Sequence, residues 1–272
     1  MMFSSQKSEN LYIVKAFASA PFTGNPAAVC VLDELLPDER LQRIARELNQ
    51  PITSFVIPED IPGHYQLRHF GPKNQVEICG HGTVAAAHVI KEHLHHFGNE
   101  IHFKLSHYDV RVVIHRDAFE LEIPNMCFRP IAQISCVTNM LGAEPLCMYK
   151  SLYDVIAEFP NEQAVRDLKP NFSYPLLKTF RAILVTAPGD HSDYCYRVFA
   201  PSIGVDEDYF CGSANGALGP LWRQKLNKDE LLGYSVSERG GPIPCAVDDS
   251  RVKILGKALT WFSGNIPLEA CA

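Results

Sequence analysis

The sequence predicts an α+β fold made of two related halves. A strand-like run leads into the turn Cys79-Gly80, which opens an alanine-rich helical pattern. The same order recurs at Cys211-Gly212, about half of the 272-residue chain further on. Matching elements at such a spacing indicate a duplicated architecture. Strands mixed with single helices favour an α+β class over a doubly wound parallel sheet.

The first half is expected to consist of strands around one central helix. Leu41, Ile44 and Leu48 share one face of a helix over residues 37–49. The central helix is expected to start near Gly82 or Thr83, and its alanines indicate tight packing on several sides. Residues 11–17 alternate and are rich in β-forming residues, which predicts a strand, and further strands are expected over 28–32, 54–57, 65–70, 101–105, 109–115 and 119–123.

The second half repeats this organisation after an expected linker over residues 124–130. Short apolar runs alternate with loops over 131–175, and the second central helix is expected over 213–225. Strands are predicted over 179–186, 194–199, 234–238, 245–248 and 252–262. The predicted domains are residues 1–128 and 129–272, with a last strand that can return to the first half. Two such halves usually hold a ligand in the cleft between them.

Composition excludes several classes of protein. The net charge of −6 and the lack of a Lys/Arg-rich run argue against nucleic acid or an anionic membrane as a partner. There is no apolar run of about 18 residues and no apolar core near the start, so neither a transmembrane helix nor a secretory signal is expected. Nine cysteines without a C-x-x-C pair point to reduced thiols in the cytoplasm.

The two Cys-Gly turns carry the most chemistry. A glycine-rich turn at a helix start presents unpaired N–H groups and a partial positive charge, which suit a carboxylate. The glycines Gly80, Gly82 and Gly212, with Ser213, are therefore expected to bind the substrate. The same field favours a thiolate and is expected to lower the pKa of Cys79 and Cys211. If both thiols faced one cleft, one could take a proton from carbon and the other return one, without a cofactor.

The alternative for each turn is a buried structural cysteine at a common type of helix start. The other seven cysteines lack such turns and are interpreted as structural. His81 beside Cys79 is a candidate proton carrier, and its alternative role is a hydrogen bond at the helix start. Asp208 and Glu207 precede the second turn, where they could line the site, cap the helix or be solvated. The remaining histidines lack a partner set for a metal site, so no metal is expected.

Six stretches together resemble the PhzF-like (phenazine biosynthesis) isomerase family, over most of the chain except residues 131–175. They are Pro21-Phe22-Thr23-Gly24-Asn25-Pro26, Ile44-Ala45-Arg46-Glu47-Leu48-Asn49, Leu67-Arg68-His69-Phe70-Gly71-Pro72, Glu77-Ile78-Cys79-Gly80-His81-Gly82-Thr83, Arg197-Val198-Phe199-Ala200-Pro201 with Gly212-Ser213-Ala214, and Ser237-Glu238-Arg239-Gly240-Gly241.

The resemblance implies a diaminopimelate-epimerase-like fold, with two pseudo-symmetric halves that each wrap a curved, mostly antiparallel sheet around a central helix. It also implies cofactor-independent proton shifts on small carboxylic acids, often by homodimers. Family residues at the positions of His81 and Asp208 help to bind and position the ligand. We also place Asn25, in the opening motif, among the substrate-binding residues.

Two departures from the family pattern redirect the expected chemistry. The family's proton-shuttling glutamate belongs where this chain has Ile52, and an isoleucine cannot move a proton. Glu47 and Glu59 are the nearest carboxylates, and neither fits the pattern. The residue before Gly-Ser-Ala, commonly not a thiol in the family, is Cys211 here. With Cys79 it restores the thiol pair of the related proline racemases and diaminopimelate epimerases.

Three functions follow. The first is a racemase or epimerase with Cys79 and Cys211 as acid and base. The second is a PhzF-type double-bond isomerase that uses His81 and Asp208. The third is a protein that binds a small acid without turning it over.

Overall fold

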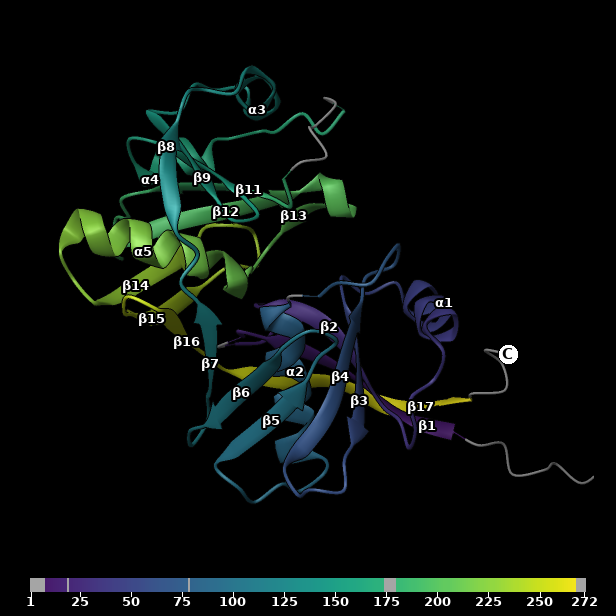
Figure 1. The fold of residues 1–272 in the computed structure, drawn as a ribbon. Helices are drawn as coiled ribbons and strands as arrows, with labels where there is room; N and C mark the ends of the chain where they lie inside the picture. The colour runs from purple at the N-terminus through teal and green to yellow at the C-terminus, as the bar shows by residue number, and fades with distance from the viewer. Residues whose placement is uncertain (1–7, 19, 78, 174–179, 268–272) are drawn as a thin grey trace, which may run out of the picture. The chain divides into compact units, whose positions relative to one another are not determined.

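The computed structural model describes residues 8–18, 20–77, 79–173 and 180–267. Within them the chain forms two compact units. Unit 1 takes in Met1–Ser19, Pro26–Leu121 and Gly256–Ala272, and unit 2 takes in Ala20–Asn25 and Glu122–Leu255. The chain therefore passes into unit 2 shortly before the predicted border at residue 128, and its last strand belongs to unit 1 (Figure 1).

Unit 1 contains two helices and the strands of a mixed sheet. They are β1 (Ser8–Ala16), β2 (Asn25–Val31), α1 (Asp38–Leu48), β3 (Thr53–Pro58), β4 (His64–Phe70), α2 (Gly80–Glu92), β5 (Glu100–Lys104), β6 (Asp109–Ile114), the first part of β7 (Phe119–Pro124) and β17 (Ala258–Pro267).

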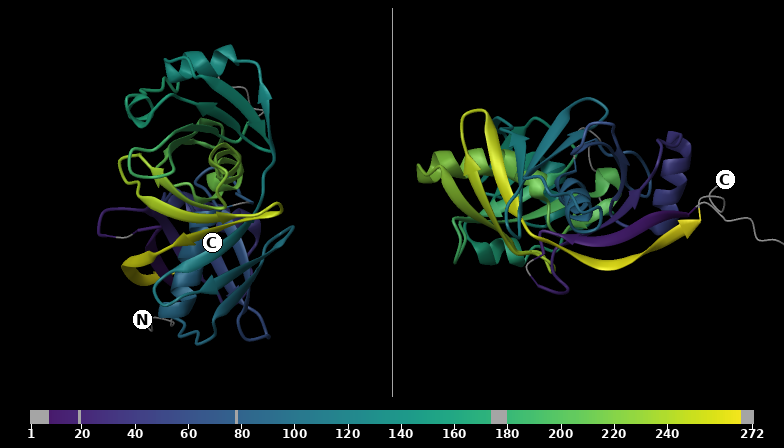
Figure 2. Two further views of the ribbon diagram at one scale, coloured as in Figure 1. Left: turned by 90° about the vertical axis from the view of Figure 1, so that its left-hand side faces the viewer. Right: turned by 90° about the horizontal axis from the view of Figure 1, so that it is seen from below.

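The sheet of unit 1 alternates between antiparallel and parallel pairs. Strand β17 pairs antiparallel with β1, which is followed by β2. The pairs β2–β3 and β4–β5 are parallel, and β3–β4, β5–β6 and β6–β7 are antiparallel. The long β1–β17 ribbon is clear in the right-hand view of Figure 2.

Helix α2 is the core of unit 1. Every residue from Gly80 to Ile90 is buried, and the helix packs against β1, β3 and β17. Small residues, Gly80, Gly82 and Ala85–Ala87, fill much of its first half, so the surrounding strands can pack closely against the helix, which Figure 1 shows inside unit 1. The expectation of a tightly packed central helix is confirmed. Its start lies two residues before the predicted Gly82, because Cys79 itself occupies the N-cap position.

Unit 2 has a corresponding set of elements. They are β8 (Phe128–Ile131), α3 (Ser135–Leu141), β9 (Cys147–Ser151), β10 (Val155–Glu158), α4 (Glu162–Arg166), β11 (Ile183–Ala187), β12 (Tyr194–Ala200), η1 (Pro201–Ile203), β13 (Val205–Asp208), η2 (Gly212–Ala214), α5 (Asn215–Leu226), β14 (Glu230–Ser235), β15 (Pro242–Val247) and β16 (Arg251–Gly256).

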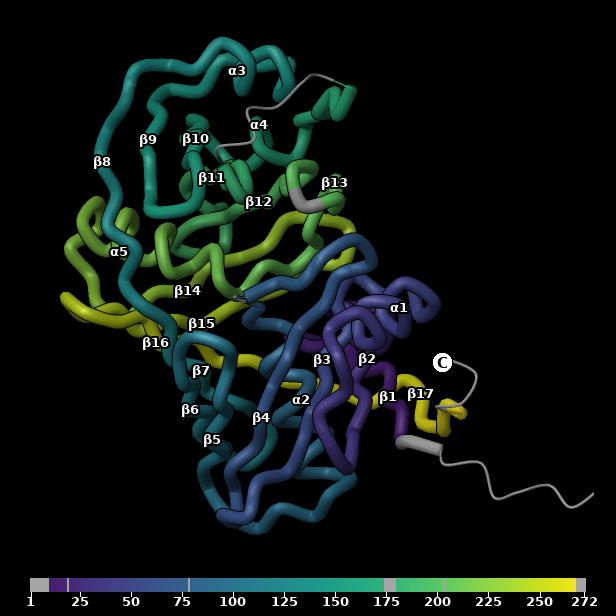
Figure 3. The backbone as a smooth tube through the Cα atoms, turned by 45° about the vertical axis from the view of Figure 1, so that its right-hand side comes forward, coloured from purple at the N-terminus to yellow at the C-terminus, as the bar shows by residue number. Residues whose placement is uncertain are grey.

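The sheet of unit 2 repeats the pairing scheme of unit 1. The pairs β10–β11 and β12–β14 are parallel, and β11–β12, β14–β15 and β15–β16 are antiparallel. Strands β8, β9 and β10 extend the sheet in antiparallel order, and Figure 3 shows β8 running beside β9. Helix α5 takes the place of α2 and packs against β14 and β15.

The register shows how closely the two units correspond. Thr53 in β3 pairs with Ala28 and Phe70, and Ile183 in β11 pairs with Val155 and Phe199 in the same manner. The Arg-x-Phe-x-Pro segments that end at Pro72 and Pro201 thus occupy equivalent places. This correspondence confirms the α+β class with a duplicated architecture.

Several predicted boundaries were wrong. Part of the expected linker over 124–130 is strand β8, and the strand expected over 234–238 is β14, which ends at Ser235. Residues 131–175 hold two short helices and two further strands around a core that includes Val137, Met140 and Phe159.

The predicted continuous strand over 252–262 is divided at Lys257. Gly256, the last residue of β16, passes against the ring of Phe17, where a Cβ would lie 2.3 Å from a ring atom. The strand expected from residue 179 begins at Ile183, and residues 174–179 lie outside the described residues.

Candidate active site

A buried cysteine precedes each central helix: Cys79 is the N-cap of α2, and Cys211 is the N-cap of η2, the short turn before α5. Cys79 has an extended backbone (φ −141°, ψ 94°) and precedes α2 directly. Cys211 is also extended (φ −90°, ψ 95°) and leads through the turn η2 into α5. Their exposed fractions are 7% and 9%. The predicted match between the two Cys-Gly turns therefore holds at the level of the backbone.

The sulfur of Cys79 is surrounded by potential hydrogen-bond partners. Its Sγ accepts the backbone N–H of Gly82 at 3.4 Å, as a capping group does. The ring of His81 lies against the same sulfur, with Nδ1 at 3.6 Å and Nε2 at 3.9 Å. A sulfur that receives an amide N–H and faces an imidazole is placed to carry negative charge.

A second set of buried side chains holds the backbone of this turn. The Thr83 hydroxyl donates to the Cys79 carbonyl at 2.9 Å, so it accepts from His69 Nε2–H at 3.2 Å. Nδ1 of His69 lies 2.9 Å from the Ser54 hydroxyl, which also lies 3.2 Å from the carbonyl of Gly82. Burial, with a smaller effect from His81, lowers the pKa of His69 to about 3, so this imidazole stays neutral.

Gly82 makes this arrangement sterically feasible. A Cβ at Gly82 would lie 2.8 Å from Ser54 Oγ and 2.9 Å from His69 Nδ1. The glycine that we expected to bind substrate therefore has a packing role, and its N–H is already directed at Cys79 Sγ.

Cys211 has different surroundings. Its Sγ lies 3.5 Å from Ser213 Oγ, and no side-chain cap closes the turn at this position. Burial and then the charge of Asp208 raise the pKa of the Cys211 thiol well above its ordinary value, against the smaller opposing effects of Arg181 and Ser213. The expectation that the helix field lowers this pKa was wrong, because burial and the nearby carboxylate outweigh it.

Asn25 fixes the carboxylate next to Cys211. Its Nδ2 donates to Asp208 Oδ1 and, at 3.2 Å, to the carbonyl of Phe210. The N–H of Phe210 donates to the same Asp208 oxygen at 3.3 Å. Because Asn25 is only 2% exposed and its Nδ2 is engaged, this geometry favours positioning of Asp208 over the predicted contact with substrate.

Glu207, the neighbouring carboxylate, has a structural role. It forms two 2.9 Å hydrogen bonds with Arg197 and accepts a third from Ser237 at 2.6 Å. Of the two candidate acids before the second turn, only Asp208 faces Cys211 closely enough to affect the pKa of its thiol.

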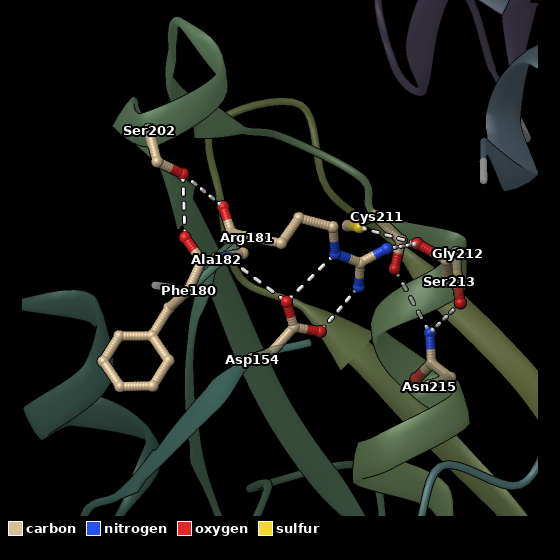
Figure 4. A network of polar contacts seen from close by, with 9 residues as sticks. All are labelled: Asp154, Phe180, Arg181, Ala182, Ser202, Cys211, Gly212, Ser213 and Asn215. Atoms are coloured by element: carbon tan, nitrogen blue, oxygen red, sulfur yellow. Dashed lines mark hydrogen bonds and ion pairs between the residues drawn. The ribbon is translucent and has the colours of Figure 1, made fainter. Parts of the chain in front are cut away.

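An arginine that our sequence analysis missed also reaches this turn (Figure 4). Arg181 Nη1 lies 3.4 Å from Ser213 Oγ, and Asp154 binds the Nε and Nη2 groups of Arg181 at 3.0 and 2.6 Å. No local motif marks either residue, since Asp154 precedes Arg181 by 27 positions. Only the parallel pairing of β10 with β11 brings the two segments together.

The turn that carries Cys211 is tied down from inside the unit. Asn215 Nδ2 donates to the carbonyls of Gly212 at 3.0 Å and Cys211 at 3.4 Å, and the Tyr194 hydroxyl donates to Asn215 Oδ1 at 2.6 Å. The predicted Gly212 and Ser213 thus belong to a rigid turn beside Arg181. Their binding of substrate stays a prediction.

Ile52 lies one residue before β3 and is buried, with an exposed fraction of 2%. Its carbonyl accepts the N–H of Ala28 at 2.9 Å. Glu47 lies exposed on α1 and Glu59 follows β3, so neither occupies the place of Ile52. Position 52 and its neighbouring carboxylates therefore place no proton-carrying side chain where the family has its glutamate.

Searches for two other kinds of site gave negative results within the described residues. No group of three or more His, Cys, Asp or Glu side chains there is arranged to hold a metal ion. None of the described helices is long and apolar enough to cross a membrane. The eight cysteines in the described ranges are free thiols, and Cys271 lies outside them.

The duplicated α+β architecture is a fold that this chain shares with solved epimerase structures. A hydroxyproline epimerase from Agrobacterium vitis has this fold at a TM-score of 0.66 and 10% identity, over 96% of this chain and 93% of that one. At that identity the likeness concerns the fold alone.

The chain belongs to the PhzF family of phenazine biosynthesis-like proteins, whose family model matches residues 14–264. A PhzF-family crystal structure from Enterococcus faecalis matches at a TM-score of 0.90 and 34% identity, over 96% of this chain and 99% of that one. An uncharacterised isomerase of Halalkalibacterium halodurans is 37% identical over 95% of this chain and 98% of its own length. One of Pseudomonas aeruginosa is also 37% identical, over 94% and 97%.

Proposed function

We propose that this protein is a cofactor-independent isomerase that moves a proton on a small carboxylic or amino acid. Cys79 is the base and Cys211 the acid. The observation that carries the proposal is the contrast between two equivalent sulfurs. One accepts an N–H and faces His81, whereas the other lies buried beside Asp208 and keeps its proton.

The chemistry begins at Cys79. His81 takes the thiol proton, and the resulting thiolate removes the proton on the carbon next to the substrate carboxylate. The C–H bond breaks, an S–H bond forms at Cys79, and the electron pair moves onto the carboxylate as an enediolate. Stabilisation of that developing charge by fixed N–H groups and cations is commonly the largest part of such catalysis.

The second proton comes from Cys211. Its S–H bond breaks as a C–H bond forms on the opposite face of the carbon, so that the configuration inverts. A thiol with a raised pKa suits this step, because it is protonated at neutral pH and is a stronger base once it has lost its proton. Exchange with solvent then restores Cys79 as the base and Cys211 as the acid.

Proton exchange in deuterated water tests this proposal. The protein is incubated with D- and L-proline, trans-4-hydroxy-L-proline, L-glutamate and L-malate, and loss of the α-proton is followed by NMR. We expect exchange on at least one acid, and a drop of about 10²-fold or more in Cys79→Ser and Cys211→Ser. Wild-type exchange rates in both variants would contradict the proposal.

A second candidate is a PhzF-type double-bond isomerase. It is favoured by family membership together with the way that Asn25 and the Phe210 N–H fix Asp208. In this reaction Asp208 and His81 handle the proton, so Asp208→Asn abolishes turnover while Cys211→Ser keeps most of it. The opposite pattern supports the thiol pair.

A further inference from the structure

We propose that Arg181 is the carboxylate anchor of the site, held in a fixed orientation by Asp154. This inference deepens the proposed function, because it names the group in unit 2 that binds the acid end of the substrate. Arg181 touches the substrate in this scheme, and Asp154 is a positioning residue that acts through it.

The guanidinium group of Arg181 is immobilised on one edge. Asp154 accepts from Nε at 3.0 Å and from Nη2 at 2.6 Å, so the plane of the group is fixed (Figure 4). The Asp154 side chain has no exposed area and also accepts the N–H of Ala182 at 3.1 Å. A fully buried carboxylate with three donors cannot turn away from its arginine.

The backbone of Arg181 is held as well. The Ser202 hydroxyl lies 2.8 Å from the carbonyl of Arg181 and 3.0 Å from that of Phe180. The guanidinium carbon lies 5.8 Å from the centre of the Tyr153 ring. Arg181 therefore presents its Nη1 edge in one direction without having to lose side-chain entropy when a ligand arrives.

The Nη1 edge points at the Cys211–Ser213 turn. Its contact is Ser213 Oγ at 3.4 Å, which is long for a hydrogen bond to a guanidinium. The Arg181 side chain is 21% exposed, although its partner Asp154 is fully buried. A partly exposed planar cation whose Nη1 makes only this long contact among the described residues, in the turn that leads to the central helix, suits a carboxylate.

The surrounding charges agree with an anion as the ligand. The charge of Asp154 is balanced by Arg181 itself. The nearest other carboxylate, Asp208, is already engaged at Oδ1 by Asn25 and Phe210. Against the effect of burial, Asp154 and, less strongly, the charge of Asp208 raise the pKa of Arg181, so its guanidinium stays charged and can pair with the carboxylate of a ligand.

Binding of acetate to the full-length chain tests the anchor without knowledge of the substrate. Protein labelled with ¹⁵N-arginine is titrated with sodium acetate and, as an uncharged probe of the same shape, with acetamide. The Arg181 guanidinium signals are assigned by their loss in Arg181→Lys. We expect them to shift saturably with acetate and not with acetamide.

The affinity for acetate should fall about tenfold or more in Arg181→Lys, because lysine keeps the charge and loses the planar pair of donors. Asp154→Asn should weaken acetate binding as well, since the guanidinium loses its orientation. Arg223→Lys is the matched control. Arg223, in the last turn of helix α5, binds the two carboxylates of Asp229 and Asp249. The affinity of Arg223→Lys for acetate should equal that of the wild type. Thermal midpoints confirm that each variant is folded.

Unchanged acetate affinity in folded Arg181→Lys, or Arg181 signals that acetate does not move, would overturn the anchor. A change in the reactivity of the Cys211 thiol without any loss of acetate binding would also overturn it, since Arg181 would then serve the thiol alone. The proposed function is judged separately by α-proton exchange. Full exchange in Arg181→Lys rejects the anchor and leaves the isomerase, whereas acetate binding at Arg181 in a protein without exchange keeps the anchor and rejects the isomerase.

Discussion

The two units place a cysteine at the same position and surround it with different chemistry. In unit 1, neutral side chains from β3, β4 and α2 hold the turn, through Ser54, His69 and Thr83. In unit 2, the corresponding region carries the ion pair Arg181–Asp154. The comparison teaches that a duplicated backbone fixes where the sulfurs lie, while the side chains behind each turn give each sulfur a different environment.

The residues just before two equivalent strands show most clearly how the two units differ. Ile52 lies one residue before β3, and Ala182 lies one residue before the equivalent strand β11. Each offers its carbonyl to the matching strand, to the N–H of Ala28 and of Val155. In unit 1 this place before the strand is apolar, whereas in unit 2 it includes the guanidinium of Arg181. Of these two equivalent places, only the one in unit 2 therefore carries a charged side chain.

The largest expected effect is a different response of the two thiols to the two enantiomers of a substrate. Cys79→Ser should slow α-proton exchange of one enantiomer by about 10²- to 10⁴-fold, and Cys211→Ser should do so for the other. NMR in deuterated water with each pure enantiomer measures this. Cys127→Ser, at an exposed thiol in unit 2, is the control and should match the wild type. Equal losses on both enantiomers in both variants would break the assigned asymmetry.

A smaller effect separates two equivalent arginines. Arg197 binds Glu207 through two hydrogen bonds, with both side chains less than one-fifth exposed, whereas Arg68 binds an Asp38 that is 60% exposed. Glu207→Gln should lower the free energy of unfolding by about 2 kcal/mol. Asp38→Asn should lower it by less than about 1 kcal/mol.

Urea denaturation monitored by circular dichroism compares these two variants with the wild type. A larger loss of unfolding free energy in Asp38→Asn than in Glu207→Gln would contradict the expectation that the buried ion pair in unit 2 stabilises the protein more than the exposed pair in unit 1.

A third difference is the acid sensitivity that histidines give to unit 1, which holds every histidine except His191. Burial lowers the pKa of His69 to about 3 and of His88 to about 4, below the ordinary value of 6.5. His69 faces Ser54, Thr83 and His81, and His88 faces Thr260, His93, Glu92 and Lys91. Below pH 6.5 these two histidines become protonated in the unfolded chain but stay neutral in the folded protein.

Stability of unit 1 is therefore fully present above pH 6.5 and falls as the pH drops towards 4, by up to about 1.4 kcal/mol per pH unit for each group. Hydrogen-exchange protection of α2 and α5, corrected for intrinsic rates, should fall first in α2 between pH 7 and 5. His88→Leu should reduce that difference. Equal loss of protection in both helices would show that acid acts elsewhere.

Much of the fold could be predicted from local pattern. The β-forming residues of β3 and β4, the apolar face of α1 and the alanines of α2 all predicted elements that the structure contains. Boundaries failed where a distant contact decides them. Gly256 ends a strand because Phe17 lies against it, and Phe17 is far away in the sequence.

The candidate site was only partly predictable for the same reason. A glycine after each cysteine predicts the helix start, so Cys79 and Cys211 could be found locally. The raised pKa of Cys211 arises from burial and Asp208, which no spacing rule encodes. Arg181 needed the parallel pairing of β10 and β11 to bring Asp154 beside it.

The way in which the chain is shared between the units affects folding during synthesis. Unit 2 is almost continuous, whereas unit 1 pairs β1 with β17, from opposite ends of the described sequence. On the ribosome, β1 is made before unit 2, and it can pair with β17 only after unit 2 has been made. The unit that begins first is thus completed last, contrary to the usual order of folding from the N-terminus.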